Sequence, residues 1–246
     1  MMYNLLMKAK MDLHTHSIAS GHYTKDTVTT LAKRAKEMGF EYLGITDHAP
    51  KMQGSASVNY FRNLRYSNRV IHDVKILYGV ELNVLNVKGE IDLENDVLEN
   101  LDYAIASLHK QVFKPKSEEE NTLALINAMK NRYVAIIGHP DDPTFRIDVK
   151  ALVESAKQTG TMLELSTVGI SPESYRGYGL ARLVEMLLLC KKNNVYITLG
   201  SDSHGTDKIG DFRNAYKLLE ELDFPTNLVA NYTPEKFFEI VKTKRN

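Results

Sequence analysis

Cysteine, net charge and long apolar runs are all scarce in this 246-residue sequence. A single cysteine, Cys190, excludes an intramolecular disulfide, and its apolar helical surroundings predict a buried small side chain rather than a reactive thiol. The 31 lysines and arginines balance the 31 aspartates and glutamates, so the formal net charge is zero. This balance argues against a dominant electrostatic attraction to anionic membranes or nucleic acid, and we expect no extended nucleic-acid binding.

Targeting and membrane-spanning patterns are missing as well. The opening MMYNLLMKAK lacks the apolar stretch and small-residue cleavage site of a secretory signal peptide, and no apolar run reaches the ~18 residues that cross a bilayer. We therefore predict a cytoplasmic protein. The glycine-rich fingerprints GxGxxG and GxxxxGK[ST] do not occur at the expected positions, which argues against the common nucleotide-binding folds.

What the sequence does contain is a regular alternation of short apolar runs with longer amphipathic ones. The short runs are rich in Ile, Val, Leu and Tyr, which is typical of strands covered on both faces. Gly39 and Gly160 suit the left-handed end of a helix, and Asp148 suits a helix N-cap. The sequence predicts strands at 9–14, 41–46, 74–82, 101–109, 133–139, 161–167 and 195–202, and helices at 27–39, 122–132, 148–160, 180–194, 211–224 and 233–244.

This alternation predicts an α/β fold, specifically a distorted TIM-like (β/α)7 barrel rather than an open doubly wound sheet. Barrels of this kind commonly reach about 250 residues as one domain. We therefore expect a single domain over residues 1–246, in which residues 1–9 form a short N-terminal extension.

Potential metal ligands follow or end most of the predicted strands. Because the carboxyl ends of parallel barrel strands meet at one mouth, these side chains are expected to converge there, and imidazole and carboxylate groups suit zinc, iron or manganese. His14 and His16 lie two positions apart on an extended segment and can grip one ion together. The candidate ligands are His14, His16, His22, His48, Glu81, His109, His139, Asp202 and His204.

Two further polar residues, Asp47 and His72, are not included among the candidate ligands. Asp47 follows the second predicted strand and is either a metal ligand itself or a residue of the second layer that orients its neighbour His48, and we assign it the second role. His72 precedes a predicted strand and is interpreted as a surface or capping residue.

These residues resemble the PHP family (polymerase and histidinol phosphatase), in particular its small stand-alone phosphatases of the YcdX type. The family's first motif, a strand ending in HxH with a further histidine shortly after it, stands here as DLHTHSIASGH. The segments GITDHAP, GVELNV, IASLH, IIGHP and LGSDSH follow in the family's order. The match spans nearly the whole chain.

The resemblance implies three divalent ions in the mouth of the barrel, with zinc expected first and manganese or iron as alternatives. Carried over by position, His14, His16, Glu81 and Asp202 would hold the first ion. Glu81 would bridge to a second ion held by His109 and His139, and His22, His48 and His204 would hold the third.

Such a site suits the hydrolysis of a phosphate ester. A water that bridges two ions acts as a hydroxide-like nucleophile, because coordination lowers its pKa from 15.7 toward ~7. We predict in-line hydrolysis of a small phosphorylated metabolite, with no protein nucleophile and no covalent intermediate. Arg176 and Ser203 are candidates to bind the substrate phosphate, whereas Lys51 and Lys110 are interpreted as solvated.

Other functions remain open at this level. Within the fold, the chain is alternatively a phosphodiesterase or exonuclease acting on nucleotides or short nucleic acid, or a histidinol phosphatase. An amidohydrolase-type deacylase is disfavoured, because those sites usually bridge their ions with a carboxylated lysine. A metal-storing or metal-sensing protein without catalytic activity is the alternative from a different class.

Overall fold

The computed structural model describes residues 8–171 and 179–246, and each of the seven predicted strands has a counterpart there. The third predicted strand is interrupted at Gly79, where the chain passes from one sheet to the other. A short additional strand, β3, was not predicted. The strands are β1 (Met11–Asp12), β2 (Tyr42–Ile45), β3 (Val70–Ile71), β4 (Val74–Tyr78), β5 (Val80–Asn83), β6 (Ala104–Ser107), β7 (Val134–Ile137), β8 (Met162–Ser166) and β9 (Ile197–Gly200).

The six predicted helices are all present, and their ends follow from local chemistry. Gly39 and Gly160 end their helices with φ of 84° and 66°, and the Asp148 side chain accepts a hydrogen bond from Ala151 N. The predicted helix at 122–132 begins earlier because Ser117 and Glu120 form a capping box. The helices are α1 (Val28–Met38), α4 (Glu118–Ala128), α5 (Val149–Thr159), α7 (Leu180–Asn193), α8 (Arg213–Glu221) and α9 (Pro234–Arg245), joined by the short, unpredicted α2 (Val58–Asn63), α3 (Asn95–Leu98) and α6 (Thr167–Ile170).

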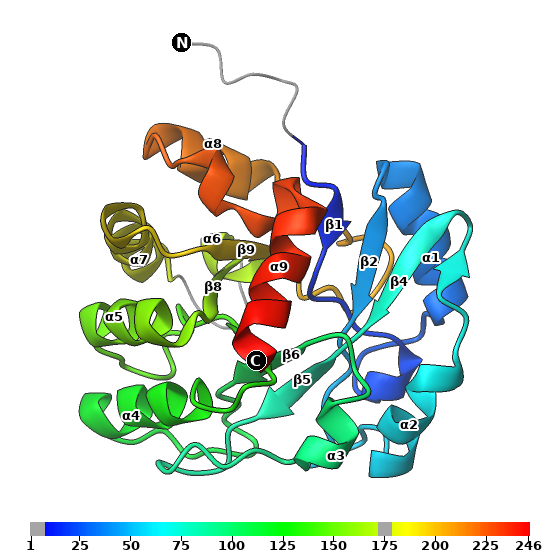
Figure 1. The fold of residues 1–246 in the computed structure, drawn as a ribbon, viewed down its shortest axis with the longest axis horizontal. Coiled ribbons are helices and arrows are strands. Elements are labelled where there is room, and N and C mark those ends of the chain that lie inside the picture. The colour runs from blue at the N-terminus through cyan, green and yellow to red at the C-terminus, as the bar shows by residue number, and fades with distance from the viewer. Residues whose placement is uncertain (1–7, 172–178) are drawn as a thin grey trace.

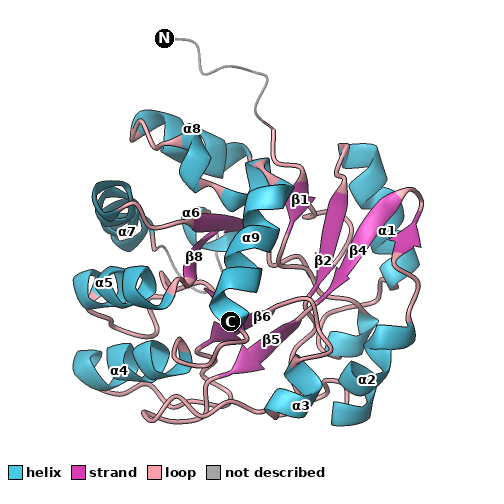
Figure 2. Cartoon of the chain, viewed as in Figure 1, coloured by secondary structure: helices cyan, strands magenta, loops and turns pink. Residues whose placement is uncertain are grey.

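The strands form two sheets, ordered β1-β2-β4-β3 and β5-β6-β7-β8-β9, with helices placed around them (Figures 1 and 2). The pairings between these strands are parallel except that of β3 with β4. Isolated parallel bridges join the sheets at both sides, between Thr15 and Ser203 and between His48 and Glu81. The predicted parallel α/β class is therefore confirmed, although the strand pairing gives two sheets rather than one continuous ring.

Helix α9 covers the amino ends of the strands and so leaves their carboxyl ends to the candidate site. In Figure 1 it lies across the space between the two sheets. The buried Phe237 of α9 packs edge-on against Tyr103, at 5.3 Å between ring centroids, in a separate core with Met11 and Leu13. The Lys244 ammonium donates to the carbonyls of Met129 and Thr159, at 2.9 and 3.0 Å, where α4 and α5 end.

The structure also tests the expectations for Cys190, for His72 and for membrane-spanning helices. Cys190 is fully buried in the main core, and burial raises the pKa of its thiol to about 12, as expected of an inert side chain. His72 is exposed in the turn between β3 and β4, which confirms its surface position. Within the described residues, none of the helices combines the length and the apolarity needed to span a bilayer.

Candidate metal centre

Glu81 of β5 lies at the centre of a buried cluster of imidazoles contributed by four other segments of the chain. Its Oε1 is 2.9 Å from His139 Nε2 and 3.1 Å from His109 Nε2. Its Oε2 is 2.7 Å from His48 Nδ1. These histidines follow β7, β6 and β2, so the carboxyl ends of the strands do converge as the sequence predicts.

A first group of donor atoms joins the segments after β1 and β9. His14, His16, Glu81 and Asp202 are buried and place one donor atom each within 4.8 Å of one another. His16 Nε2 is 3.0 Å from Asp202 Oδ1, and His14 Nε2 is 3.4 Å from Glu81 Oε1. This is the set that the resemblance to the PHP family implies for the first ion.

A second group lies on the other side of Glu81. His48, Glu81 and His109 again place their donor atoms within 4.8 Å of one another. His139 reaches the same carboxylate oxygen as His109, and their rings lie 5.3 Å apart. The structure thus brings His109, His139 and Glu81 together, as the resemblance implies, and adds His48, which the resemblance implies only for the third ion.

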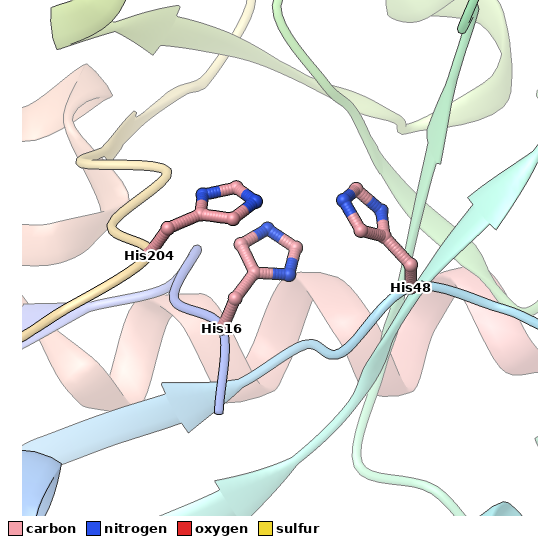
Figure 3. A group of neighbouring side chains, drawn as sticks. All are labelled: His16, His48 and His204. Carbon is pink, nitrogen blue, oxygen red and sulfur yellow. The ribbon is translucent and has the colours of Figure 1, made fainter. Parts of the chain in front are cut away.

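A third group consists of His16, His48 and His204, whose rings come from three separate segments and face one space (Figure 3). The half-buried His22 stacks on His48 at 4.7 Å between centroids and lies 5.2 Å from His204. His22 is therefore beside the expected partners, although its nitrogens are not among the donor atoms that approach within 4.8 Å. His16 and His48 both belong to two groups.

Several buried donor atoms in this cluster have close neighbours but no hydrogen bond. His14 Nε2, His48 Nδ1 and Glu81 Oε2 are buried and lack a hydrogen-bond partner, even though His48 Nδ1 and Glu81 Oε2 are only 2.7 Å apart. Unpaired buried polar atoms are costly and rare in native proteins. Donor atoms that surround a common cation have this arrangement, so the residues fit one or more divalent ions.

Burial and the neighbouring charges shift the pKa values within the cluster. Burial opposes protonation of His14, but Glu164, Glu81 and Asp202 outweigh it and raise its pKa well above the ordinary value. Burial also opposes ionisation of Glu81, but the surrounding imidazoles lower its pKa well below the ordinary value. For His22, burial and the nearby His48 and His204 lower the pKa to about 4, so this imidazole is neutral near pH 7.

Backbone conformation is unusual at two of these residues. His139 and Asp202 have φ of 28° and 48°, in the left-handed region that residues other than glycine seldom occupy. Such strain persists where the surrounding structure imposes it, and it is concentrated at functional sites.

A second layer of polar groups orients the histidines. Asp47 accepts hydrogen bonds from the hydroxyls of Ser17, Ser20 and Tyr60, at 2.8, 2.8 and 2.6 Å. Since Ser20 donates its only proton to Asp47, its oxygen accepts from His16 Nδ1, 2.9 Å away. The Nε2 lone pair of His16 is thereby directed toward Asp202, 3.0 Å away, and Asp47 contacts His16 only through Ser20.

Sequence reasoning missed two orienting residues, Glu164 and Asn83. The buried Glu164 of β8 lies 2.7 Å from His14 Nδ1 and accepts a hydrogen bond of 2.7 Å from His139 N. Asn83 Oδ1 lies 2.8 Å from His109 Nδ1. The sequence feature that could have identified Glu164 is that it is the only charged residue in the apolar run MLELST. Gly200 allows its approach, because a Cβ there would lie 1.8 Å from Glu164 Oε1.

A cavity of about 880 Å³ opens over the cluster. Its lining includes Lys110, whereas neither Lys51 nor Ser203 is among the described residues that line it. Ser203 is buried and its hydroxyl donates to the carbonyl of Gly205, so its expected contact with substrate phosphate is not supported. Arg176 lies outside the residues that the structure describes. The candidate ligands that line the cavity are His22, His48, His109, Asp202 and His204.

The chain combines a parallel α/β fold with a buried histidine–carboxylate cluster at the carboxyl ends of the strands. This combination is typical of α/β proteins that bind metal ions at that end of the sheet. The PHP domain profile matches residues 12–199. The chain belongs to the PHP family, as the resemblance in its motifs indicated.

Comparison with individual proteins agrees with this assignment. A protein of Acetivibrio thermocellus named "Probable phosphatase" is 42% identical and covers 97% of this chain and 98% of its own length. A Probable phosphatase of Aliivibrio fischeri is 36% identical and covers 96% of this chain and 94% of its own length. The structure of histidinol phosphate phosphatase from Lactococcus lactis, complexed with zinc, L-histidinol and phosphate, shares the fold. Its TM-score is 0.60 at 19% identity, over 88% of this chain and 95% of that one.

Proposed function

We propose that this protein is a metal-dependent phosphomonoesterase that hydrolyses a small phosphorylated metabolite at the Glu81 cluster. The observation that carries the proposal is that three buried atoms of the cluster, His14 Nε2, His48 Nδ1 and Glu81 Oε2, have no hydrogen-bond partner among the described residues. His48 also lines the large cavity, so the cluster is open to a substrate on that side. The names of the curated relatives, which are probable phosphatases over nearly the whole length, support the reaction class. The residue at the centre of the cluster is Glu81, whereas an amidohydrolase-type deacylase usually has a carboxylated lysine there. This difference favours a phosphatase over a deacylase.

We further propose that the two sheets form one distorted seven-stranded barrel. In this interpretation β4 and β5 are two halves of a single strand bent at Gly79. The bridges between Thr15 and Ser203 and between His48 and Glu81 support closure, because the first connects the ends of the edge strands β1 and β9 and the second connects the segment after β2 to the edge strand β5. The candidate site would then lie at the carboxyl mouth of the barrel.

Three ions are the proposed complement of the site, with zinc favoured by the imidazole-rich donor set. His14, His16, Glu81 and Asp202 would hold the first ion, and Glu81, His109 and His139 the second. His22, His48 and His204 would hold the third, and the approach of His16 to this last group supports a continuous cluster.

The protein's own residues would orient the metal ligands and attract the substrate. Bound divalent ions supply an activated water and neutralise charge on the phosphoryl group. Asp47 through Ser20, and Glu164 directly, fix the proton on the Nδ1 atoms of His16 and His14, so that their Nε2 lone pairs remain available. Lys110, at the wall of the cavity, is placed to attract an anionic substrate. We propose no protein nucleophile.

Metal analysis and a phosphatase assay test this proposal. We expect two or three ions per chain by mass spectrometry, hydrolysis of p-nitrophenyl phosphate, loss of activity on chelation and recovery on adding Zn²⁺. His14→Ala should lower kcat/KM by at least about 100-fold, because it removes a ligand of the first ion.

His72→Ala is the matched control, since His72 is exposed outside the cluster. Fewer than two ions per metal-replete chain, or full activity in His14→Ala, would contradict the proposal. A metal-loaded protein inert toward a panel of phosphate esters would instead indicate metal storage or sensing, and preference for bis(p-nitrophenyl) phosphate would indicate a phosphodiesterase.

A further inference from the structure

We propose that Tyr23 stacks on a flat aromatic or heteroaromatic leaving group, so that the natural substrate is an aryl or heteroaryl phosphate ester. This inference rests on the proposed phosphatase function and names its substrate class. Tyr23 binds and orients the leaving group and takes no part in proton transfer.

The ring of Tyr23 stands at the edge of the cavity, one residue beyond the metal cluster. Tyr23 lines the cavity together with His22, and their rings meet edge to face at 5.8 Å between centroids. His22 in turn stacks on His48 at 4.7 Å. A phosphate held at the cluster would therefore direct its leaving group along the wall that carries Tyr23.

Tyr23 is conspicuously exposed for an aromatic residue in a cavity wall. Its relative exposure is 94%, the highest among the large exposed apolar side chains of the described residues. Its φ is 55°, a left-handed conformation that is unfavourable for a bulky residue. Neither feature stabilises the folded chain, and backbone strain of this kind is concentrated at active sites and ligand clamps.

The segment that carries Tyr23 is held by close backbone packing. Gly21 has φ of 83° and packs against Gly54, so closely that a Cβ on Gly21 would lie 1.9 Å from the Gly54 carbonyl oxygen. The preceding turn is fixed because Ser17 Oγ accepts from Ala19 N and donates to Asp47. The exposed ring is thus presented from a positioned loop.

A second side chain in the lining of the cavity, that of Met52, also suits a flat ring. The loop that contains Gly54 also places Met52, which is 4% exposed, in the lining of the same cavity. Thioether and phenol side chains both pack well against aromatic faces. The cavity of about 880 Å³ leaves ample room for a ring system beyond the phosphate.

Binding of two non-hydrolysable analogues tests the inference without depending on turnover. Phenylphosphonate and methylphosphonate are titrated into the zinc-loaded protein by calorimetry. We expect Tyr23→Ala to weaken phenylphosphonate about five- to tenfold while methylphosphonate changes less than twofold, since one aromatic contact is lost. Tyr23→Phe should retain the wild-type affinities, because the ring rather than the hydroxyl makes the contact.

Kinetics and a matched control complete the design. Tyr23→Ala should lower kcat/KM for phenyl phosphate and leave that for glycerol phosphate unchanged, whereas Tyr66→Ala should alter neither, because the exposed Tyr66 is outside the cavity lining. Equal effects of Tyr23→Ala on both phosphonates, or none, would overturn the role of Tyr23 while leaving the phosphatase proposal intact. A wild-type protein that binds neither phosphonate and hydrolyses neither ester would overturn both.

Discussion

At the residue scale, Glu164 shows how one buried side chain organises two others that are far away in the sequence. It contacts His14 through the ring nitrogen that faces away from the cluster and His139 through the backbone N–H. A carboxylate in this position fixes the tautomer of His14 and increases the basicity of its other nitrogen. The charge of Glu164 is also among the causes that raise the pKa of His14.

Replacing Glu164 should therefore weaken metal binding although the residue does not lie in any of the proposed ligand sets. We expect Glu164→Ala to lower zinc affinity by about 10- to 100-fold, and Glu164→Gln to lower it less, because the amide oxygen still accepts from His14. Competition with a chromogenic chelator measures this affinity.

Glu154→Ala serves as the control, since Glu154 is an exposed acid on α5. Unchanged zinc affinity in Glu164→Ala would show that His14 needs no such partner.

At the element scale, the β3–β4 hairpin combines a favourable pairing with an unfavourable turn. Val70 and Ile71 pair with Lys75 and Val74, so the turn consists of two residues, His72 and Asp73. Both have positive φ, at 52° and 60°, as two-residue turns of type I′ require. Asn-Gly or Asp-Gly suits this turn better than His-Asp, because glycine adopts positive φ without a steric penalty.

Asp73→Gly should accordingly stabilise the protein. Glycine relieves the left-handed strain of the folded chain but also adds entropy to the unfolded chain. The net effect is expected to raise the free energy of unfolding by about 0.5–1 kcal/mol, which raises Tm by about 1–4 °C. Differential scanning fluorimetry at constant metal loading detects such a change.

Asp73 also pairs with Lys36, at 3.4 Å between two exposed groups. Lys36→Ala isolates the loss of that pair and is expected to change Tm by less than about 2 °C. A lower Tm in Asp73→Gly than in Lys36→Ala would contradict the strain argument.

At the scale of the whole molecule, the two ends of the strands serve separate purposes. The carboxyl ends carry the histidine–carboxylate cluster, and the amino ends are covered by α9. The Arg245 guanidinium donates to the carbonyls of Leu101 and Asp102, before β6, and Lys244 donates to two carbonyls at the ends of α4 and α5. The C-terminal helix therefore joins segments that are remote from it in the sequence.

Phe237→Ala should destabilise the fold while leaving the site intact. Removing this fully buried ring from its contact with Tyr103 is expected to cost about 3–5 kcal/mol in the free energy of unfolding. Urea unfolding measures the loss, and metal content and kcat at low temperature should stay within twofold of wild type.

Phe238→Ala provides the comparison, because Phe238 is only partly buried and should cost less. An equal loss in both variants would argue that α9 does not seal the amino ends through Phe237.

The sequence by itself determined the strands, the main helices and most of the candidate ligands. Local periodicity fixes which residues face the core, and parallel connectivity forces the residues after β1, β2, β6, β7 and β9 to the same end of the sheets. His14, His109 and Asp202 could be anticipated for that reason, whereas Glu81 lies within β5. Cys190 could be anticipated as well, since its burial follows from the apolar face of its helix.

Only the tertiary structure decided which of these residues face one another. His14 and Glu164 are separated by 150 positions, and their contact depends on strand register and on the space left by Gly200. The sharing of His48 between two groups and the division of one strand at Gly79 likewise follow from how the two sheets meet. Side-chain convergence is a property of packing between distant segments, which local patterns in the sequence do not encode.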